Sequence, residues 1–404
     1  MGLVKNRVLL LLVAVGIVAA SGLAFLTHAP NRLVSGAGIS WVEVVNASDG
    51  LNKTFALLAT LVPALLLSAG IFIRPTRVIH FWLPVTATLL LTGLVWVAAE
   101  HAARLASITA DPAGGTTPGI ARTSFGGAFW ILAALGWLAA SDAIRHLGLK
   151  PGWRLIASAA VIGPVLVLIA TGALDQLSLL REYANRKDVF NAALLQHVQL
   201  VVASLVPALL IGVPLGVASA RAGRWMNALR PALFAILNII QTIPSIALFG
   251  LLMAPLALLA TSVPALARWG IKGVGLAPAV IALALYSLLP VVRSTAAGLS
   301  QVPRPIVDAA LGMGLSSRQI FWQVEAPLAL PVFLAGLRVA IVQTIGMAVV
   351  AALIGAGGFG AIMFQGLLGG ALDLVLLGVV PVVAMAVLVD ALLKTIALSL
   401  AHEF

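Results

Sequence analysis

The sequence predicts an all-α, polytopic membrane protein with about ten transmembrane helices. The 404 residues are 61% hydrophobic and only 9% charged, with a mean hydropathy of +1.12, whereas a soluble domain is about a quarter charged. Helices are favoured because the strands of outer-membrane barrels alternate and give a much weaker apolar signal. These observations exclude a soluble enzyme, a cytosolic nucleic-acid-binding protein and a disordered chain.

Ten stretches approach the roughly 20 apolar residues that a helix needs to cross a bilayer. The predicted spans are 8–26, 54–73, 78–99, 124–141, 155–173, 197–220, 231–253, 275–292, 332–354 and 374–397. Residues 1–27 also fit a cleavable signal peptide, with a basic start and small residues near Ala19. Their apolar run is nearly long enough to span the membrane, so we predict an uncleaved helix.

The Lys and Arg residues indicate how these spans are oriented. If the N-terminus is cytoplasmic, 15 of them fall on the inner side and 9 on the outer side, while the acidic residues favour the outer side. The net charge of +11 therefore lies almost entirely inside, as the positive-inside rule requires. We expect both termini to be cytoplasmic, and we interpret the charge as a topology signal rather than as a nucleic-acid-binding surface.

The two halves of the chain differ in character. Residues 1–173 contain five spans without a functional motif, joined by loops such as 111–118, and their role is unknown. Residues 174–196 are polar and are predicted to form an external linker or an interfacial segment. Residues 197–404 contain the other five spans, in which prolines interrupt helices and polar side chains recur. Broken helices are tolerated in lipid where neighbouring groups or a cavity satisfy the backbone.

The polar side chains and glycines of the second half are candidates for a translocation pathway or gate. They either bond one helix to another or line a hydrated path. The candidates are Asn238, Gln241, Thr242, Pro244, Ser245, Tyr286, Gln343, Gly355, Gly357, Gly358 and Gly360. The glycines also fit the dinucleotide-binding pattern G-x-G-x-x-G, but they follow a span rather than a strand. We expect them to allow close helix packing or to form an external gate.

Two further polar residues in this half remain open to alternatives. Asp390 is the one acidic residue deep in a span, and it is either functional or a cap near the cytoplasmic interface. His197 at the start of a span either touches solute or marks an interfacial helix start, which we favour.

The inner loop 293–331 is the most specific feature of the sequence. Prolines precede a predicted short helix over 306–313, and Gly314 is suited to the left-handed turn that ends it. Ser316 and Ser317 can cap a second helix over 318–324, which we expect to break before Pro327. An apolar face of the first helix would suit docking into a groove on a soluble partner. That face consists of Ile306, Ala309, Ala310 and Met313.

This loop resembles the "EAA" loop of binding-protein-dependent ABC importer permeases. The matching residues are Asp308-Ala309-Ala310, Gly314, Val324 and Pro327, with Asp308 in place of Glu, Val324 in place of Ile and Ala326 in place of Leu. The segments 211–217, 241–248, 284–293, 308–314 and 353–360 resemble the glycine betaine/choline/carnitine branch, the osmoprotectant permeases. The additional N-terminal spans resemble a longer subgroup of that branch.

The resemblance implies that the last five spans form the core of a type I importer permease. It also implies that the loop seats in a separate ATP-binding subunit through Asp308, Ala309, Ala310, Gly312, Gly314 and Pro327. The expected partners are that subunit, an extracytoplasmic solute-binding protein, a second permease copy in a homodimer and the lipid bilayer, with no nucleic acid. The expected location is the bacterial cytoplasmic (inner) membrane.

No catalytic residue, metal site or cofactor is predicted. There is no Cys, the six His do not have metal-ligand spacing, and no Walker A pattern occurs. Three alternatives stay open. The solute is another small molecule such as an amino acid, the chain is an ion-coupled secondary transporter with two five-span repeats, or it is a membrane scaffold that transports nothing.

Overall fold

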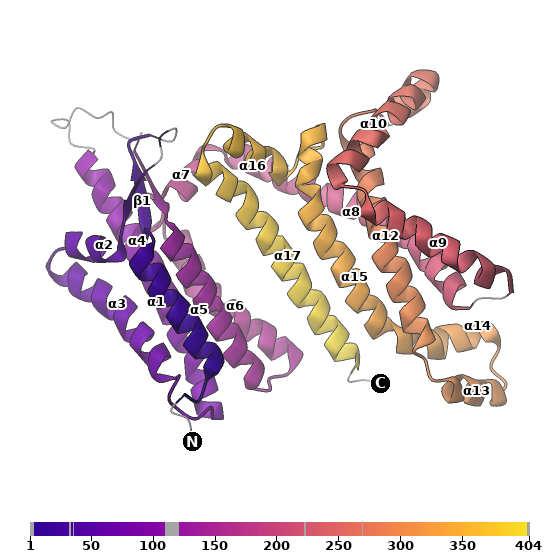
Figure 1. Cartoon of the computed structure of the whole chain (residues 1–404), viewed down its shortest axis with the longest axis horizontal. Helices are drawn as coiled ribbons and strands as arrows, with labels where there is room; N and C mark the ends of the chain where they lie inside the picture. Colours follow the sequence, from indigo (N-terminus) through magenta and orange to yellow (C-terminus); the bar gives the residue numbers. More distant parts are fainter. Residues whose placement is uncertain are drawn as a thin grey trace. The chain divides into compact units, whose positions relative to one another are not determined.

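The computed structural model describes residues 4–31, 34, 36–109, 121–221, 224–268 and 270–401, without the side chains of 109, 224–227 and 401. Figure 1 traces the chain by its helices and strands. The chain divides into two compact units. Unit 1 comprises Met1–Asn185 with Leu368–Asp373, and unit 2 comprises Arg186–Leu367 with Leu374–Phe404. The predicted loop 111–118 and His402 lie outside the described residues.

Unit 1 is built mainly from helices. They are α1 (Arg7–Gly22), α2 (Trp41–Ala47), α3 (Gly50–Ala69), α4 (Arg77–Thr109), α5 (Gly127–His146), α6 (Pro151–Ala170) and α7 (Ser178–Asn185). Helix α4 is central, because α3, α5 and α6 all pack against it. Small side chains such as Ala87 and Ala98 are fully buried on α4, which allows these helices to approach closely.

A small antiparallel sheet in unit 1 was not predicted. Its strands β1 (Leu26–Ala29), β2 (Ala37–Ile39) and β3 (Arg122–Phe125) lie in the order β2-β1-β3. Strands of three or four residues are too short to show an alternating pattern in the sequence. The chain turns into β1 soon after Gly22, so the predicted span 8–26 becomes a helix of only 16 residues.

Polar residues of strand β3 pair with acidic residues of unit 1. Arg122 forms an ion pair with the buried Glu182 at 3.3 Å. The carboxylate of Asp373 accepts hydrogen bonds from Ser124 at 3.0 Å and from Ser178. Residues 174–196 therefore contain α7 and the beginning of the next helix, and the carboxylate of Glu182 is satisfied inside unit 1.

Unit 2 contains the longer run of elements. They are α8 (Lys187–Ala220), α9 (Arg224–Thr242), α10 (Ser245–Ser262), α11 (Pro264–Arg268), α12 (Leu276–Ser300), α13 (Arg304–Gly312), α14 (Ser317–Ile320), a π-helical turn (Phe321–Glu325), α15 (Ala326–Ala348), a 3₁₀ turn (Val350–Ile354), α16 (Phe359–Leu368) and α17 (Leu372–Ala401). Helix α12 is the most buried of these, and α8 and α15 pack along it.

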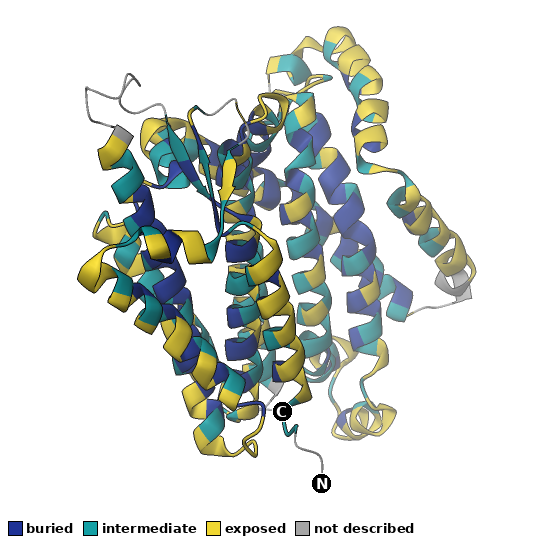
Figure 2. Cartoon of the chain, turned by 60° about the vertical axis from the view of Figure 1, so that its left-hand side comes forward, coloured by how far each residue is buried: buried dark blue, intermediate teal, exposed yellow. Residues whose placement is uncertain are grey.

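Many helices have large apolar side chains that are exposed. Exposed residues of every type are yellow in Figure 2. Among the described residues, nine helices are long and apolar enough to cross a membrane. Shorter apolar helices include α1 and residues 228–242 of α9. Large apolar side chains that face outward on such helices are expected where lipid rather than water surrounds them.

The predicted span 231–253 is wrong, because two helices occupy this stretch. Helix α9 ends at Thr242, and α10 begins at Ser245 with Pro244 as its N-cap at φ −56° and ψ 137°. Proline lacks an N–H and disfavours the helical conformation in the residue before it. Pro244 therefore ends α9 rather than kinking a continuous span.

Candidate functional site

The first helix of the inner loop is α13, and it begins two residues before the predicted 306. Pro303 is its N-cap, and Pro305 lies in its first turn, where a missing N–H costs nothing. Gly314 follows at φ +81°, which confirms the left-handed turn. The turn is closed by a hydrogen bond from the Leu315 N–H to the Ala310 carbonyl at 3.2 Å.

The second helix of the loop, α14, has the predicted cap but begins at Ser317, one residue before the predicted start, and ends differently. Ser316 caps it, since its Oγ accepts from the Gln319 N–H at 3.4 Å while Gln319 Oε1 accepts from the Ser316 N–H at 2.8 Å. The predicted break before Pro327 is wrong, because Ala326 is helical at φ −65° and ψ −43°. The π-helical turn shifts the hydrogen-bond register immediately before Pro327, so the helix passes through the proline.

The loop is anchored on one side and open on the other. Ala310 and Ile320 are only 1% and 3% exposed, so they hold α13 and α14 in place. Met313 is 74% exposed and Trp322 is 65% exposed, and Asp308 and Ala309 are also exposed. The predicted apolar face is therefore divided: Ala310 points inward, while its other three members form an apolar edge open to a partner.

An ion pair that the sequence analysis missed ties this loop to α8. Arg221, directly after α8, pairs with Glu325 of the π-helical turn, and its guanidinium lies 4.5 Å from the centroid of the Phe321 ring. The two charged residues are 104 positions apart, so no local spacing reveals the pair.

The candidate pathway residues of α9 and α12 bond to each other. Arg293 donates to the Asn238 side chain at 2.7 Å, and Gln241 Nε2 donates to the Tyr286 carbonyl at 2.6 Å. The Tyr286 hydroxyl donates to the carbonyl of Ile243, which the break at Pro244 leaves without a helical partner. These contacts join α9 to α12 beside the break.

The other polar candidates do not join this group. Thr242 donates to Ile239 of its own helix at 2.7 Å, and Gln343 of α15 contacts the Met347 sulfur at 3.6 Å. Pro244 and Ser245 form the start of α10. The candidates thus occupy several elements of unit 2 rather than one lined site, and their role in translocation stays a prediction.

The glycine segment Gly355–Gly360 packs closely against α8 and α15. The Gly358 N–H donates to Gln196 Oε1 of α8 at 2.9 Å. A Cβ on Gly357 would lie 2.2 Å from that same oxygen, and a Cβ on Gly360 would lie 2.0 Å from the Val349 carbonyl oxygen. Close approach, one of the two roles expected for these glycines, is therefore seen, and a gating role stays a prediction.

His197 and Asp390 both have partners within unit 2. His197 is fully buried in the third turn of α8, and its Nε2 lies 3.1 Å from the Ile345 carbonyl oxygen. It is thus neither at the helix start nor open to solute. Asp390 of α17 pairs with Arg338 of α15 at 3.4 Å. The described residues contain no cluster of three or more His, Asp or Glu that could hold a metal ion.

Two family models match the chain in separate regions. Residues 212–401 match the binding-protein-dependent transport system inner membrane component, and residues 5–180 match the N-terminal domain of the ABC transporter permease YehY. These matches and the fold define a class, the multi-pass ABC importer permeases.

Similar curated proteins align with about half of the chain. The osmoprotectant import permease protein OsmW of Salmonella typhimurium is 39% identical over 202 residues, which are 49% of this chain and 85% of OsmW. The glycine betaine/carnitine/choline permease OpuCB of Bacillus subtilis is 34% identical over 198 residues, 49% of this chain and 82% of OpuCB. A structure of the MetNI methionine ABC transporter, inward facing, is 22% identical with a TM-score of 0.45, covering 54% of this chain and 98% of that chain.

The chain belongs to the inner-membrane permeases of binding-protein-dependent ABC transport systems. It has the longer form, because residues 5–180 add the second matched domain. Such a permease is not an enzyme: ATP is hydrolysed on a separate ATP-binding subunit, and a binding protein supplies the solute. The chain is accordingly a multi-pass protein of the inner membrane.

Proposed function

We propose that this permease forms the translocation pathway of an ATP-driven importer for compatible solutes such as glycine betaine, choline or related osmoprotectants. The observation that supports its coupling to ATP is the loop 293–331, with its anchored base and its open apolar edge on α13. The relatives named as osmoprotectant permeases support the solute class. Two identical copies would form one pathway, with both termini cytoplasmic.

The loop is connected to two long helices, α8 and α15, as an element that transmits motion to the transmembrane helices must be. Helix α14 continues through the π-helical turn into α15, and Arg221 ties that turn to the end of α8. A subunit that grips α13 would therefore move α8 and α15 together. Rigid-body motion of helices between two states is how alternating access operates. In this proposal Asp308, Ala309 and Gly314 form the docking face.

The domain roles belong to the same proposal. Residues 197–404 act as the permease core with the coupling loop, and residues 174–196 act as an external linker. Residues 1–173 form a membrane region to which this proposal assigns no role.

We expect the permease to pass the solute rather than to bind it tightly. A quaternary ammonium group is held by exposed aromatic faces, but Phe249 and Tyr286 are only 1% and 4% exposed. The high-affinity aromatic cage would then lie in the binding protein. Micromolar, saturable binding of radiolabelled glycine betaine to the purified permease alone would contradict this expectation.

Transport can be tested in liposomes that contain the permease, its ATP-binding subunit and its binding protein. We expect glycine betaine to stimulate ATP hydrolysis and to accumulate inside, whereas an amino acid without a quaternary ammonium group should do neither. Accumulation driven by an ion gradient without ATP would instead support the secondary-transporter alternative.

The coupling role has a sharper test in the variant Gly314→Arg. The bulky side chain at φ +81° should block both the turn and the docking face, so solute-stimulated hydrolysis should be abolished. Gly148→Arg is the matched control, because Gly148 also has a positive φ, of 65°, with open space around it but lies in the α5–α6 loop. Equal stimulated hydrolysis in both variants would refute the coupling role of this turn.

A further inference from the structure

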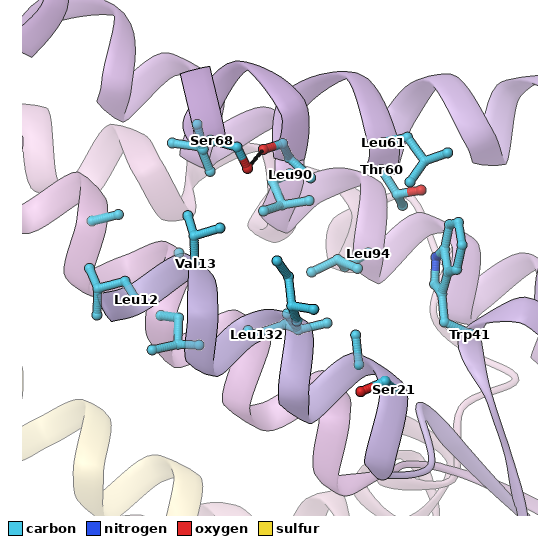
Figure 3. Close-up of a pocket in the computed structure, with 18 of the residues that line it drawn as sticks. Leu12, Val13, Ser21, Trp41, Thr60, Leu61, Ser68, Leu90, Leu94 and Leu132 are labelled. Carbon is cyan, nitrogen blue, oxygen red and sulfur yellow. Dashed lines mark hydrogen bonds between the residues drawn. The ribbon is translucent and has the colours of Figure 1, made fainter. Parts of the chain in front are cut away.

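Unit 1 contains an apolar pocket that the transport function does not use. Figure 3 shows it between side chains of α1, α2, α3, α4 and α5. Its volume is about 410 Å³, within the range of about 300 to 1,000 Å³ that ligand pockets occupy. Leu12, Val13, Leu61, Leu94 and Leu132 are among the side chains that surround the space.

The lining offers almost no polar group to a ligand or to water. The hydroxyls of Ser21, Thr60 and Ser68 lie on the lining, but each donates to a carbonyl of its own helix, at 3.1, 2.7 and 2.8 Å. Apolar cavities stay dry, and side chains around an empty space lose dispersion contacts. The pocket therefore suits a hydrocarbon occupant.

The pocket is bordered by exposed apolar side chains, as expected for a surface that faces lipid. Its lining residues Ile17 of α1 and Leu61 of α3 are 64% and 42% exposed, and their neighbours Val18 and Leu65 are 69% and 67% exposed. At one end lies Trp41, the first residue of α2, a helix of only seven residues that does not cross the membrane. Tryptophan is enriched at the membrane–water boundary.

The packing around the pocket distinguishes between the possible occupants. Helix α1 contacts both α3 and α5, and α4 also contacts both of these helices. A helix with its side chains is about 10 Å across, so a helix of a partner or of a second copy would have to separate helices that already touch. A single unbranched acyl chain is far narrower and can run along the space between the helices.

We propose that this pocket binds one acyl chain of a membrane phospholipid, with the polar end of the lipid beside Trp41. The lipid would fill the space between α1, α3 and α5 and hold these helices together. The proposal concerns unit 1 alone and does not depend on the solute that unit 2 transports.

The first test maps lipid contacts on the unmodified full-length chain. The protein is placed in nanodiscs of phosphatidylethanolamine and phosphatidylglycerol with a trace of phosphatidylethanolamine that has a diazirine on its acyl chain. After illumination, mass spectrometry should find the label concentrated around Ile17 and Leu61. Leu166 of α6 is the comparison site, since it is 57% exposed and does not line the pocket. Equal or stronger labelling around Leu166 would overturn the proposal.

The second test fills the pocket. Ala20 of α1 lines it, and the variant Ala20→Phe should lower the labelling of Leu61 about tenfold, which is about 1.4 kcal/mol in lipid affinity. Ala14→Phe is the matched control, because Ala14 is exposed on the same helix and does not line the pocket. In this variant the labelling of Leu61 should equal that in the unmodified chain.

Ala64→Phe on α3 provides a second pocket-filling variant with the same expected loss, in case Ala20→Phe fails to fold by size-exclusion chromatography. Unchanged labelling in a folded pocket variant, or an equal loss in Ala14→Phe, would overturn the proposal. A pocket occupied by a protein helix would leave its lining unlabelled in the first test, which also overturns it.

Discussion

Two glycine-containing regions of unit 2 use the same residue type for different physical reasons. In the coupling turn, a Cβ on Gly312 or Gly314 would meet nothing within 4 Å, and Gly314 is required by its φ of +81°. In the glycine segment, a Cβ on Gly360 would lie 2.0 Å from the Val349 carbonyl oxygen. Glycine is needed in the turn for its left-handed backbone conformation, whereas in the glycine segment it is needed because the neighbouring backbone leaves no room for a side chain.

The largest effect should come from Gly360→Ala. The added Cβ meets backbone rather than a flexible side chain, so helices must shift, at a cost of about 1–3 kcal/mol or more. In a unit of this size the unfolding temperature should fall by about 2–4 °C per kcal/mol, measured by thermal unfolding in detergent. Gly346→Ala on α15 is the control, with nothing within 4 Å of its Cβ. Equal midpoints for the two variants would show that the segment is not closely packed.

Gly314→Ala should lower the stability less than Gly360→Ala does. Its main effect should be on coupling to ATP hydrolysis. Alanine fits the open space but pays about 1–2 kcal/mol for the left-handed conformation, so the turn should reshape without disturbing the spans. We expect a lower solute-stimulated ATPase rate in liposomes and a smaller fall of the unfolding midpoint than Gly360→Ala produces. A normal rate would indicate that the turn geometry has no part in docking.

Gly312→Ala tests a glycine of the coupling turn that does not need a positive φ, and it should change the stability least of the three variants. Gly312 is the last residue of α13, has no positive φ and has open space around it. Alanine is favoured over glycine in a helix by about 0.5–1 kcal/mol. The unfolding temperature should therefore be unchanged or slightly higher, and a clear loss of stability would contradict the open space around Gly312.

Composition and local spacing were enough to predict the helical membrane fold and much of the inner loop. The Ser316 cap and the Gly314 turn are local devices, so the sequence around them contains the whole signal. Prolines were less informative. Pro244 ends a helix, whereas Pro327 lies in the first turn of α15. The difference depends on the π-helical turn that leads into α15 before Pro327, which the residue pattern does not show.

The contacts between distant segments could not be predicted. Gln196 and Gly358 are 162 positions apart, and Tyr286 bonds to Ile243 from another helix. Such bonds depend on how α8, α12 and the glycine segment pack against their neighbours. The packing of segments far apart in the chain cannot be derived from a single sequence. The same holds for the three-stranded sheet, whose pairing joins residues 26–29 with residues 122–125.

The length of α8 has a consequence for the depth of the glycine segment. Its 34 residues extend about 51 Å, while a hydrocarbon core about 30 Å thick requires only about 39 Å even at a steep tilt of about 40°. At least about eight residues therefore lie outside the hydrocarbon core, and the first turns, with Lys187, Asp188 and Asn191, are the polar end of the helix. Gln196 follows five residues after Asn191, so we expect Gly358, which donates to it, to lie near the boundary between the hydrocarbon core and the headgroups.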